Sequence, residues 1–304
     1  MTESYPTRPD RLDLGEGIRW TGEHLVLTDI LSGRLLVAPD VPTAPLRTVA
    51  TLPVPLGAVA PVAGFPGTWI AAAGTGLCLL GADGSAHWLA RPEANTPLPM
   101  RMNDAGADPG GRFWAGSMAC SVAEGAGSLY RVDHDGTVTR VLEDITIPNG
   151  PAFNADGTLM YLADSARGVV CRYSLDPVTA RLGTAQEFLE VESGSPDGMA
   201  VDAEGAVWVA LWGTGTVRRH LADGTLDRVI SLPARQPAGV CLAEDVLHIT
   251  TARVGLDPVG PYDGGLFSVR VDVPGAPAAP YRPAPSLLAG LPSYRADVAA
   301  RRSG

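Results

Sequence analysis

The chain has 304 residues and a formal net charge of −10, and no run of Lys or Arg exceeds two residues. This composition argues against a nucleic-acid-binding surface and against anionic membranes as partners. Hydrophobic residues make up 45% and charged residues 18%, which predicts a folded chain with a large core rather than a disordered one. The 36 Gly and 27 Pro follow no Gly-X-Y period, so we expect many short strands joined by turns and exclude collagen.

The N-terminal residues carry neither a basic start nor an apolar stretch, so no signal peptide is expected. The longest uncharged stretch, 48–82, is interrupted by four prolines, and a membrane-spanning helix there is not expected. Four cysteines occur without a C-x-x-C pair. Reduced, mostly buried thiols in a cytoplasmic protein are the simplest interpretation.

Six similar segments recur along the chain, each with an apolar strand, a turn and a second apolar strand. In chain order they are 16–29, 56–72, 103–116, 149–164, 197–210 and 238–250. The third, fourth and fifth segments are the most alike, and they begin at positions 103, 149 and 197. Each segment has the pattern of a β-hairpin. Further turns between them complete about four strands in every 40–48 residues.

This period is typical of the blades of a β-propeller. The sequence therefore predicts an all-β, six-bladed propeller with four antiparallel strands per blade around a central channel. It forms one domain over 1–304, with a core of about 14–285 and a tail of about 286–304. Residues 287–291 are expected to form a closing strand. An open β-sandwich is the alternative, but six copies at nearly constant spacing favour the ring.

The repeat places six residues at equivalent positions near the start of the innermost strands. They are Glu16, Leu56, Asn103, Asn149, Asp197 and Ala238. Four of the six carry side-chain oxygens, and a Gly follows five of the six positions. Because inner strands line the channel, we expect these side chains to lie around one ring at one depth.

Four converging polar side chains have two interpretations. Each could cap a local turn, which is common for Asn and Asp. Together they could bind a hard cation, because carboxylate and amide oxygens suit Ca²⁺, Mg²⁺ or Mn²⁺. The shared position in the repeat favours the cation site. A cation with so few protein ligands would keep positions open for water and a substrate oxygen.

In its motifs the chain resembles the SMP-30/gluconolactonase/regucalcin-like family of six-bladed propellers. The motifs that carry the resemblance are Gly15-Glu16-Gly17, Arg101-Met102-Asn103-Asp104, residues 108–118, Gly127–Arg131, Pro148-Asn149-Gly150, Tyr161–Ser165, Pro196-Asp197-Gly198-Met199 and Trp208–Ala210. They cover nearly the whole chain up to about Arg270, and their joint occurrence is more specific than any one of them.

The resemblance implies a role for each matching residue. Glu16, Asn149 and Asp197 match the family's ligands for one divalent cation, most simply Ca²⁺, with Mn²⁺, Mg²⁺ or Zn²⁺ as alternatives. Asp197 also matches the proposed general base, and Arg101 and Asn103 match residues that hold the substrate or a metal-bound water. The implied activity is hydrolysis of a sugar lactone, in which the cation polarises the carbonyl and Asp197 accepts a proton from water.

One departure bears on the substrate. Many relatives have an acidic substrate contact shortly after the stretch that matches Gly116–Met118, whereas Ala119-Cys120-Ser121 follows here. The alternatives are therefore a phosphotriesterase, an enzyme acting on a lactone or ester of specialised metabolism, and a non-catalytic calcium-binding propeller. The expected partner is a small lactone or ester, and the expected state is a monomer or a weak homodimer. Trp212 could line the pocket.

Overall fold

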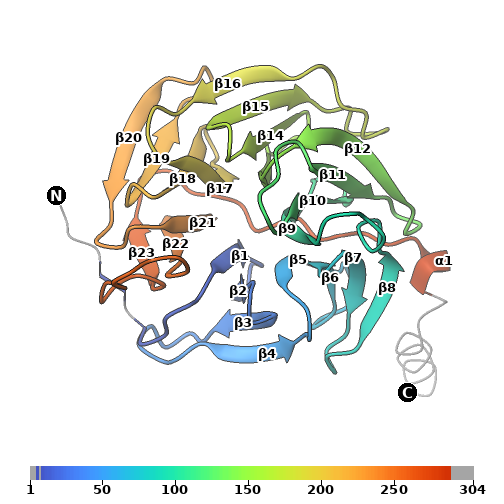
Figure 1. Cartoon of the computed structure of the whole chain (residues 1–304), viewed down its shortest axis with the longest axis horizontal. Coiled ribbons are helices and arrows are strands. Elements are labelled where there is room, and N and C mark those ends of the chain that lie inside the picture. The colour runs from blue at the N-terminus through green and yellow to red at the C-terminus, as the bar shows by residue number, and fades with distance from the viewer. Residues whose placement is uncertain (1–4, 7, 289–304) are drawn as a thin grey trace.

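The computed structural model describes residues 5, 6 and 8–288, and six antiparallel sheets surround a central channel (Figure 1). The first three sheets contain β1 (Gly15–Trp20), β2 (Leu25–Asp29), β3 (Arg34–Ala38) and β4 (Arg47–Thr51); β5 (Leu56–Pro61), β6 (Trp69–Ala73), β7 (Gly76–Leu80) and β8 (Ala86–Ala90); and β9 (Met100–Ala107), β10 (Phe113–Ala119), β11 (Gly127–Val132) and β12 (Val138–Ile145). The next two contain β13 (Pro148–Phe153), β14 (Leu159–Asp164), β15 (Val169–Ser174) and β16 (Gln186–Glu190); and β17 (Ser195–Val201), β18 (Val207–Trp212), β19 (Thr216–His220) and β20 (Leu226–Ser231). The sixth contains β21 (Pro237–Ala243), β22 (Val246–Thr251) and β23 (Leu266–Arg270).

The predicted six-bladed propeller is confirmed. Five blades have four strands each, and the described part of the sixth blade has three. In every blade the strand that comes first in the chain lies nearest the channel, and each later strand lies further out (Figure 1).

The core is divided into apolar layers, one between each pair of neighbouring blades. Leu56 and Val59 of the second blade pack with Val26 and Leu35 of the first, and equivalent clusters join the second to the third, the third to the fourth, the fourth to the fifth and the fifth to the sixth. A further layer, which includes Ile18 and Cys241, joins the sixth blade to the first. A middle strand is therefore covered on both faces, which explains why β6 is buried along its whole length.

The two ends of the chain both help to close the ring. Leu14 forms a β-bridge with Ala252, and Arg253 forms an ion pair with Asp13 at 2.8 Å. After β23, residues 272–284 form what we call the strap, which crosses one face of the propeller from the sixth blade towards the third (Figure 1). Along its course, backbone hydrogen bonds link Ala278 to Trp20 and Tyr281 to Pro61.

The end of the described chain differs from the expected closing strand. Residues Pro285–Leu288 form the short helix α1, and Leu288 is buried against the layer between the second and third blades. Pro285 begins this helix, and a proline fits the first helical turn because the N–H that it lacks would have no partner there. The rest of the expected strand, 289–291, lies outside the described residues. No helix in the described part of the chain is long and apolar enough to cross a membrane.

Candidate active site

The repeated polar positions all lie beside an irregularity in an inner strand. In β1 the pairing register shifts between Glu16 and Arg19, in β13 between Asn149 and Ala152, and in β17 between Pro196 and Met199. A bulge bends a strand and changes the direction of its side chains. The same local distortion thus recurs in the first, fourth and fifth blades, next to residues that the sequence predicts to share one ring.

Glycines let the inner strands approach each other at this depth. A Cβ on Gly57 would lie 2.0 Å from the backbone oxygen of Asn103 in the next blade. Gly150 has a φ of +78°, and a Cβ there would lie 2.7 Å from the methyl carbon of Met199. These positions need glycine because the backbone of one blade meets the neighbouring blade directly.

A chain of hydrogen bonds joins the polar residues of the third, fourth and fifth blades. Arg101 Nη1 donates to Asn103 Oδ1 at 2.6 Å, and Asn103 Nδ2 donates to Asn149 Oδ1 at 2.7 Å. Asn149 Nδ2 donates to Ser165 Oγ at 2.8 Å, and that hydroxyl donates to the backbone oxygen of Pro196. Asn103 and Asn149 are both 5% exposed, so the network fixes the two amide orientations within the protein.

Glu16 and Asp197 face each other across the same region. Both are almost fully buried, and their carboxyl groups are close enough to act on each other's pKa. Burial, and then the charge of Asp104, raises the pKa of Glu16 to about 8. Burial, and then the charge of Glu16, raises the pKa of Asp197 well above its ordinary value. The cause is desolvation of two neighbouring carboxylates, which the charges of Arg19 and Arg101 offset only in part.

The donor set at this point fits a hard divalent cation. The Oδ1 atom of Asp197 is buried without a hydrogen-bond partner, and such an atom normally has one. Across residues 5, 6 and 8–288, no three His, Cys, Asp or Glu side chains gather as a metal site. The candidate set instead combines two carboxylates with the amide oxygen of Asn149, which are ligand types that Ca²⁺ accepts.

A third buried carboxylate, Asp104, is paired with the positive side chain of Arg19. Arg19 Nη2 lies 3.0 Å from Asp104 Oδ1 and 2.5 Å from the backbone oxygen of Ala105. The Arg19 Nη1 atom donates to its neighbour Ile18 at 2.7 Å. This pair links β1 to β9 across the channel and was not anticipated from the sequence. Asp104 breaks the repeat, because the other five blades have glycine at this position.

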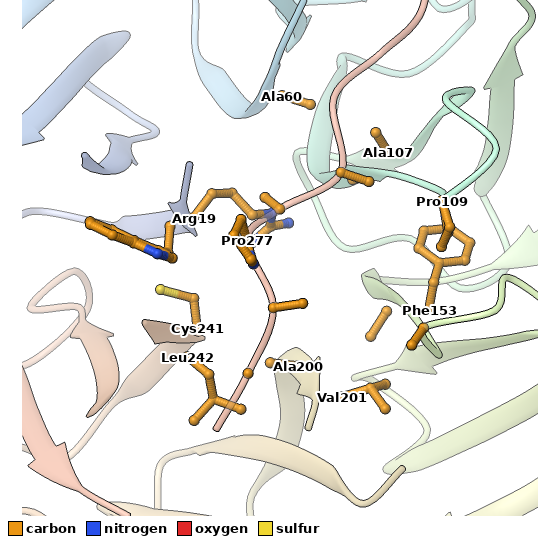
Figure 2. Close-up of a pocket in the computed structure, with 18 of the residues that line it drawn as sticks. Arg19, Ala60, Ala107, Pro109, Phe153, Ala200, Val201, Cys241, Leu242 and Pro277 are labelled. Atoms are coloured by element: carbon orange, nitrogen blue, oxygen red, sulfur yellow. The ribbon is translucent and has the colours of Figure 1, made fainter. Parts of the chain in front are cut away.

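Arg19 also lines a cavity at the other end of the channel. The cavity has a volume of about 700 Å³ and is walled by the far ends of the inner strands and by the strap. Figure 2 shows Arg19 and Pro277 beside it, with Phe153 and Leu242 further around the wall. Its lining is mostly apolar and does not include Glu16, Asn149 or Asp197.

The remaining predicted positions fill out the ring. Leu56 and Ala238 are fully buried, so the second and sixth blades contribute apolar side chains at this depth. Trp212 is half-buried against Leu14, Ile30 and Ala252, and it pairs with Ser195 at the end of the fifth blade's inner hairpin.

Cys120 and Ser121 lie at the rim of the candidate site. Both are exposed and directly follow β10, whose Met118 pairs with Arg101. The Cys120 thiol is close enough to influence the Arg101 guanidinium electrostatically. Of the four free cysteines, Cys78 and Cys241 are buried, whereas Cys120 is exposed and Cys171 is half-buried.

Ser165 and the Arg19–Asp104 pair are the site residues that sequence reasoning missed. Ser165 ends the Tyr161–Ser165 motif, but only the structure reveals its bonds to Asn149 and Pro196. Its place in that motif was the one sequence signal for Ser165. The repeat gives none, because Ser165 lies in a connection and not at the repeated position of an inner strand.

Comparisons with known proteins agree with this architecture. The family model described as "SMP-30/Gluconolactonase/LRE-like region" matches residues 14–253. A 6-deoxy-6-sulfogluconolactonase from Pseudomonas putida is 34% identical over 276 residues, which are 86% of this chain and 92% of that protein. A regucalcin from Macaca fascicularis is 30% identical over 86% of this chain and 92% of its own length.

A solved structure gives the same picture in three dimensions. The calcium-binding protein regucalcin from Agrobacterium tumefaciens superposes with a TM-score of 0.84 and 30% sequence identity, and the match covers 92% of this chain and 97% of that one. The repeat, the propeller and the family match all agree: the chain belongs to the SMP-30/gluconolactonase/LRE-like family.

Proposed function

We propose that this protein is a divalent-cation-dependent lactonase that opens a sugar-type lactone ring. The observation that carries the proposal is the buried, partnerless Oδ1 of Asp197 beside Glu16 and the Asn103–Asn149 pair. Relatives that are named as lactonases support the reaction class. They include the Pseudomonas putida protein and a pentonolactonase from Haloferax volcanii, which is 34% identical over 66% of this chain and 67% of that protein.

Glu16, Asn149 and Asp197 would hold the cation, with Ca²⁺ as the first candidate. When bound there, a divalent cation supplies Lewis-acid polarisation of the lactone carbonyl and stabilises the negative charge that develops on its oxygen. Support for Ca²⁺ comes from the oxygen-only donor set and from the description of the Agrobacterium tumefaciens relative as a calcium-binding protein.

The chain's own residues would carry the proton and orient the substrate. Asp197 accepts a proton from the attacking water as the water oxygen bonds to the carbonyl carbon, and returns it to the ring oxygen when the C–O bond breaks. Arg101 donates to oxygens of the substrate. Asn103 is held between Arg101 and Asn149, so it fixes the position of the arginine relative to the carboxylates.

A matched pair of measurements tests this function. Removal of divalent cations with a chelator should abolish hydrolysis of an aldonolactone, and added Ca²⁺ or Mn²⁺ should restore it. The D197N variant should lower kcat on the order of 10²–10⁴-fold, because it lacks the base. Full hydrolysis in metal-free protein would contradict the proposal. Tight Ca²⁺ binding without turnover of lactones or phosphotriesters would instead favour a calcium-binding propeller.

A further inference from the structure

Arg101 has an unusual position for a guanidinium group. It is half-buried at the candidate active site, and only its Nη1 atom is engaged, with Asn103 Oδ1 and the backbone oxygen of Met102. In the described part of the chain, Nε and Nη2 have no hydrogen-bond partner, and no Asp or Glu forms an ion pair with this side chain. Two donors are therefore left available in the geometry that matches a carboxylate or a phosphate.

The loop beside Arg101 supplies no counter-charge. Residues Ala119–Ala126 contain one acid, Glu124, which is exposed and forms no ion pair in the described structure. Cys120 of this loop is exposed and close enough to act on Arg101, and its backbone N–H donates to the backbone oxygen of Pro99 at 2.8 Å. The free Nε and Nη2 donors of Arg101 therefore find no acidic partner on this loop in the described structure.

Arg101 forms no ion pair with the carboxylates deeper in the described site, although the charges of Glu16 and Asp197 act on it. Asp104 is compensated by Arg19 in a buried ion pair. Glu16 and Asp197 together match the two positive charges of one divalent cation. The positive charge of Arg101 is then left for the substrate, in surroundings where water screens it weakly.

From this geometry we propose that the site selects lactones that carry a second, anionic group such as a carboxylate, a sulfonate or a phosphate, which the Nε and Nη2 atoms of Arg101 bind. The inference rests on the proposed lactonase activity and names its substrate class. A neutral aldonolactone fills the same ring position but leaves the guanidinium unpaired. An anionic group at the end of the ring's side chain, away from the reacting carbonyl, pairs with the guanidinium of Arg101.

Two lactones that share a ring test this selectivity directly. D-Galactono-1,4-lactone is neutral, and D-galactaro-1,4-lactone replaces its terminal CH₂OH by a carboxylate. With Ca²⁺-loaded protein, we expect kcat/KM to be at least about tenfold higher for the carboxylated ring, which is the scale of one partly buried charge pair. Equal or faster turnover of the neutral lactone would overturn the inference and leave the lactonase activity intact.

A charge placed at Cys120 provides the second arm. C120E sets a carboxylate beside Arg101, so the preference for the anionic lactone should fall about tenfold. V178E adds the same charge at a side chain that is 78% exposed, in the connection after β15 on the face away from the site, and should leave the preference unchanged. An unaltered preference in C120E, or an equal loss in V178E, would overturn the inference.

A binding measurement separates failure of the selectivity from failure of the function. The two matching lactams resist hydrolysis, and their affinities can be measured by calorimetry with the wild-type protein and C120E. If no lactone is turned over, the proposed function fails, while tighter binding of the carboxylated lactam in the wild type still supports the inference. Equal binding of both lactams contradicts it.

Discussion

At the scale of single residues, the site depends on side chains that hold other side chains. Asn149 presents its amide oxygen to Asn103 and its amide nitrogen to Ser165, so its orientation is fixed from both sides. Ser165 in turn donates to Pro196, the residue before Asp197. Ser165 is therefore a positioning residue that links two of the proposed cation ligands.

The S165A variant tests this positioning role. Loss of the hydroxyl leaves Asn149 Nδ2 without its acceptor, so we expect Ca²⁺ affinity to fall about 10–100-fold. The free energy of unfolding of the metal-free protein should fall by about 1–2 kcal/mol. Calorimetric Ca²⁺ titration and urea unfolding measure the two effects.

S174A is the matched control, because Ser174 is exposed at the far end of β15. It should change neither quantity. Unchanged Ca²⁺ affinity in S165A would show that Ser165 does not position the site.

The sequence predicts some of the residues at the site and misses others. Glu16, Asn103, Asn149 and Asp197 share one position in the repeat, and the structure brings them together, although their roles stay predictions. Ser165 and Arg19 act from positions that no repeat marks, and their contacts depend on how neighbouring blades face each other. Such contacts become visible only when the ring is closed.

At the scale of strands, the spacing between inner strands is set by glycine. The position of Asn103 depends on the second blade, because the backbone oxygen of Asn103 occupies the space that a Cβ on Gly57 would take. A residue outside the site thus controls the depth of a residue within it.

We expect G57A to displace Asn103. The added methyl group has no free space beside the backbone oxygen of Asn103, so the variant should lose on the order of 1–3 kcal/mol of stability and about tenfold in Ca²⁺ affinity. Thermal unfolding and Ca²⁺ titration check both numbers.

A second glycine variant separates strain from displacement. Gly84 lies in a turn with a φ of +79° and nothing within 4 Å of its Cβ position. G84A should cost about 1 kcal/mol through backbone strain alone and leave Ca²⁺ affinity unchanged. Equal Ca²⁺ affinity in G57A and wild type would contradict the proposed control of depth.

We expect His248 to make the sixth blade sensitive to acid. Its Nδ1 atom lies 2.8 Å from Ser268 Oγ across the β22–β23 pair. Burial, with a smaller effect from the positive charge of Arg8, lowers its pKa to about 4. A histidine whose pKa is lower in the folded state stabilises the fold above about pH 6.5, and this contribution is lost as the pH falls towards 4.

The difference between wild type and H248Q isolates this effect. Between pH 7 and pH 4, wild type should lose on the order of 2 kcal/mol of unfolding free energy that H248Q does not lose. Urea unfolding at several pH values measures it, with H24Q as a control at an exposed histidine. Parallel pH profiles for wild type and H248Q would disprove the assignment.

At the scale of the whole molecule, the ring was predictable because turn residues recur along the sequence with the period of a propeller blade. Six segments of nearly constant spacing predicted six blades, and the six apolar layers between the blades show why the ring closes. The strap was not predictable, because residues 272–284 have no periodic pattern and are positioned by the surfaces they cross. Tyr281 shows this: it is fully buried and donates to the backbone oxygen of Asp133, far away in the sequence.

The closed ring is also a requirement of the proposed function. Glu16, Asn149 and Asp197 come from the first, fourth and fifth blades, and only the circular arrangement brings their inner strands to one channel. The acidic net charge of −10 is consistent with a site that attracts cations, whereas Arg101 adds a local positive charge at its rim.

The most direct test of this account is a calorimetric titration of metal-free protein with Ca²⁺, with lactonase activity followed at each addition. The account predicts one Ca²⁺ per chain, activity that rises in proportion to occupancy, and loss of both in D197N. A wild-type protein that binds no divalent cation, or that binds it equally well after Asp197→Asn, would contradict it.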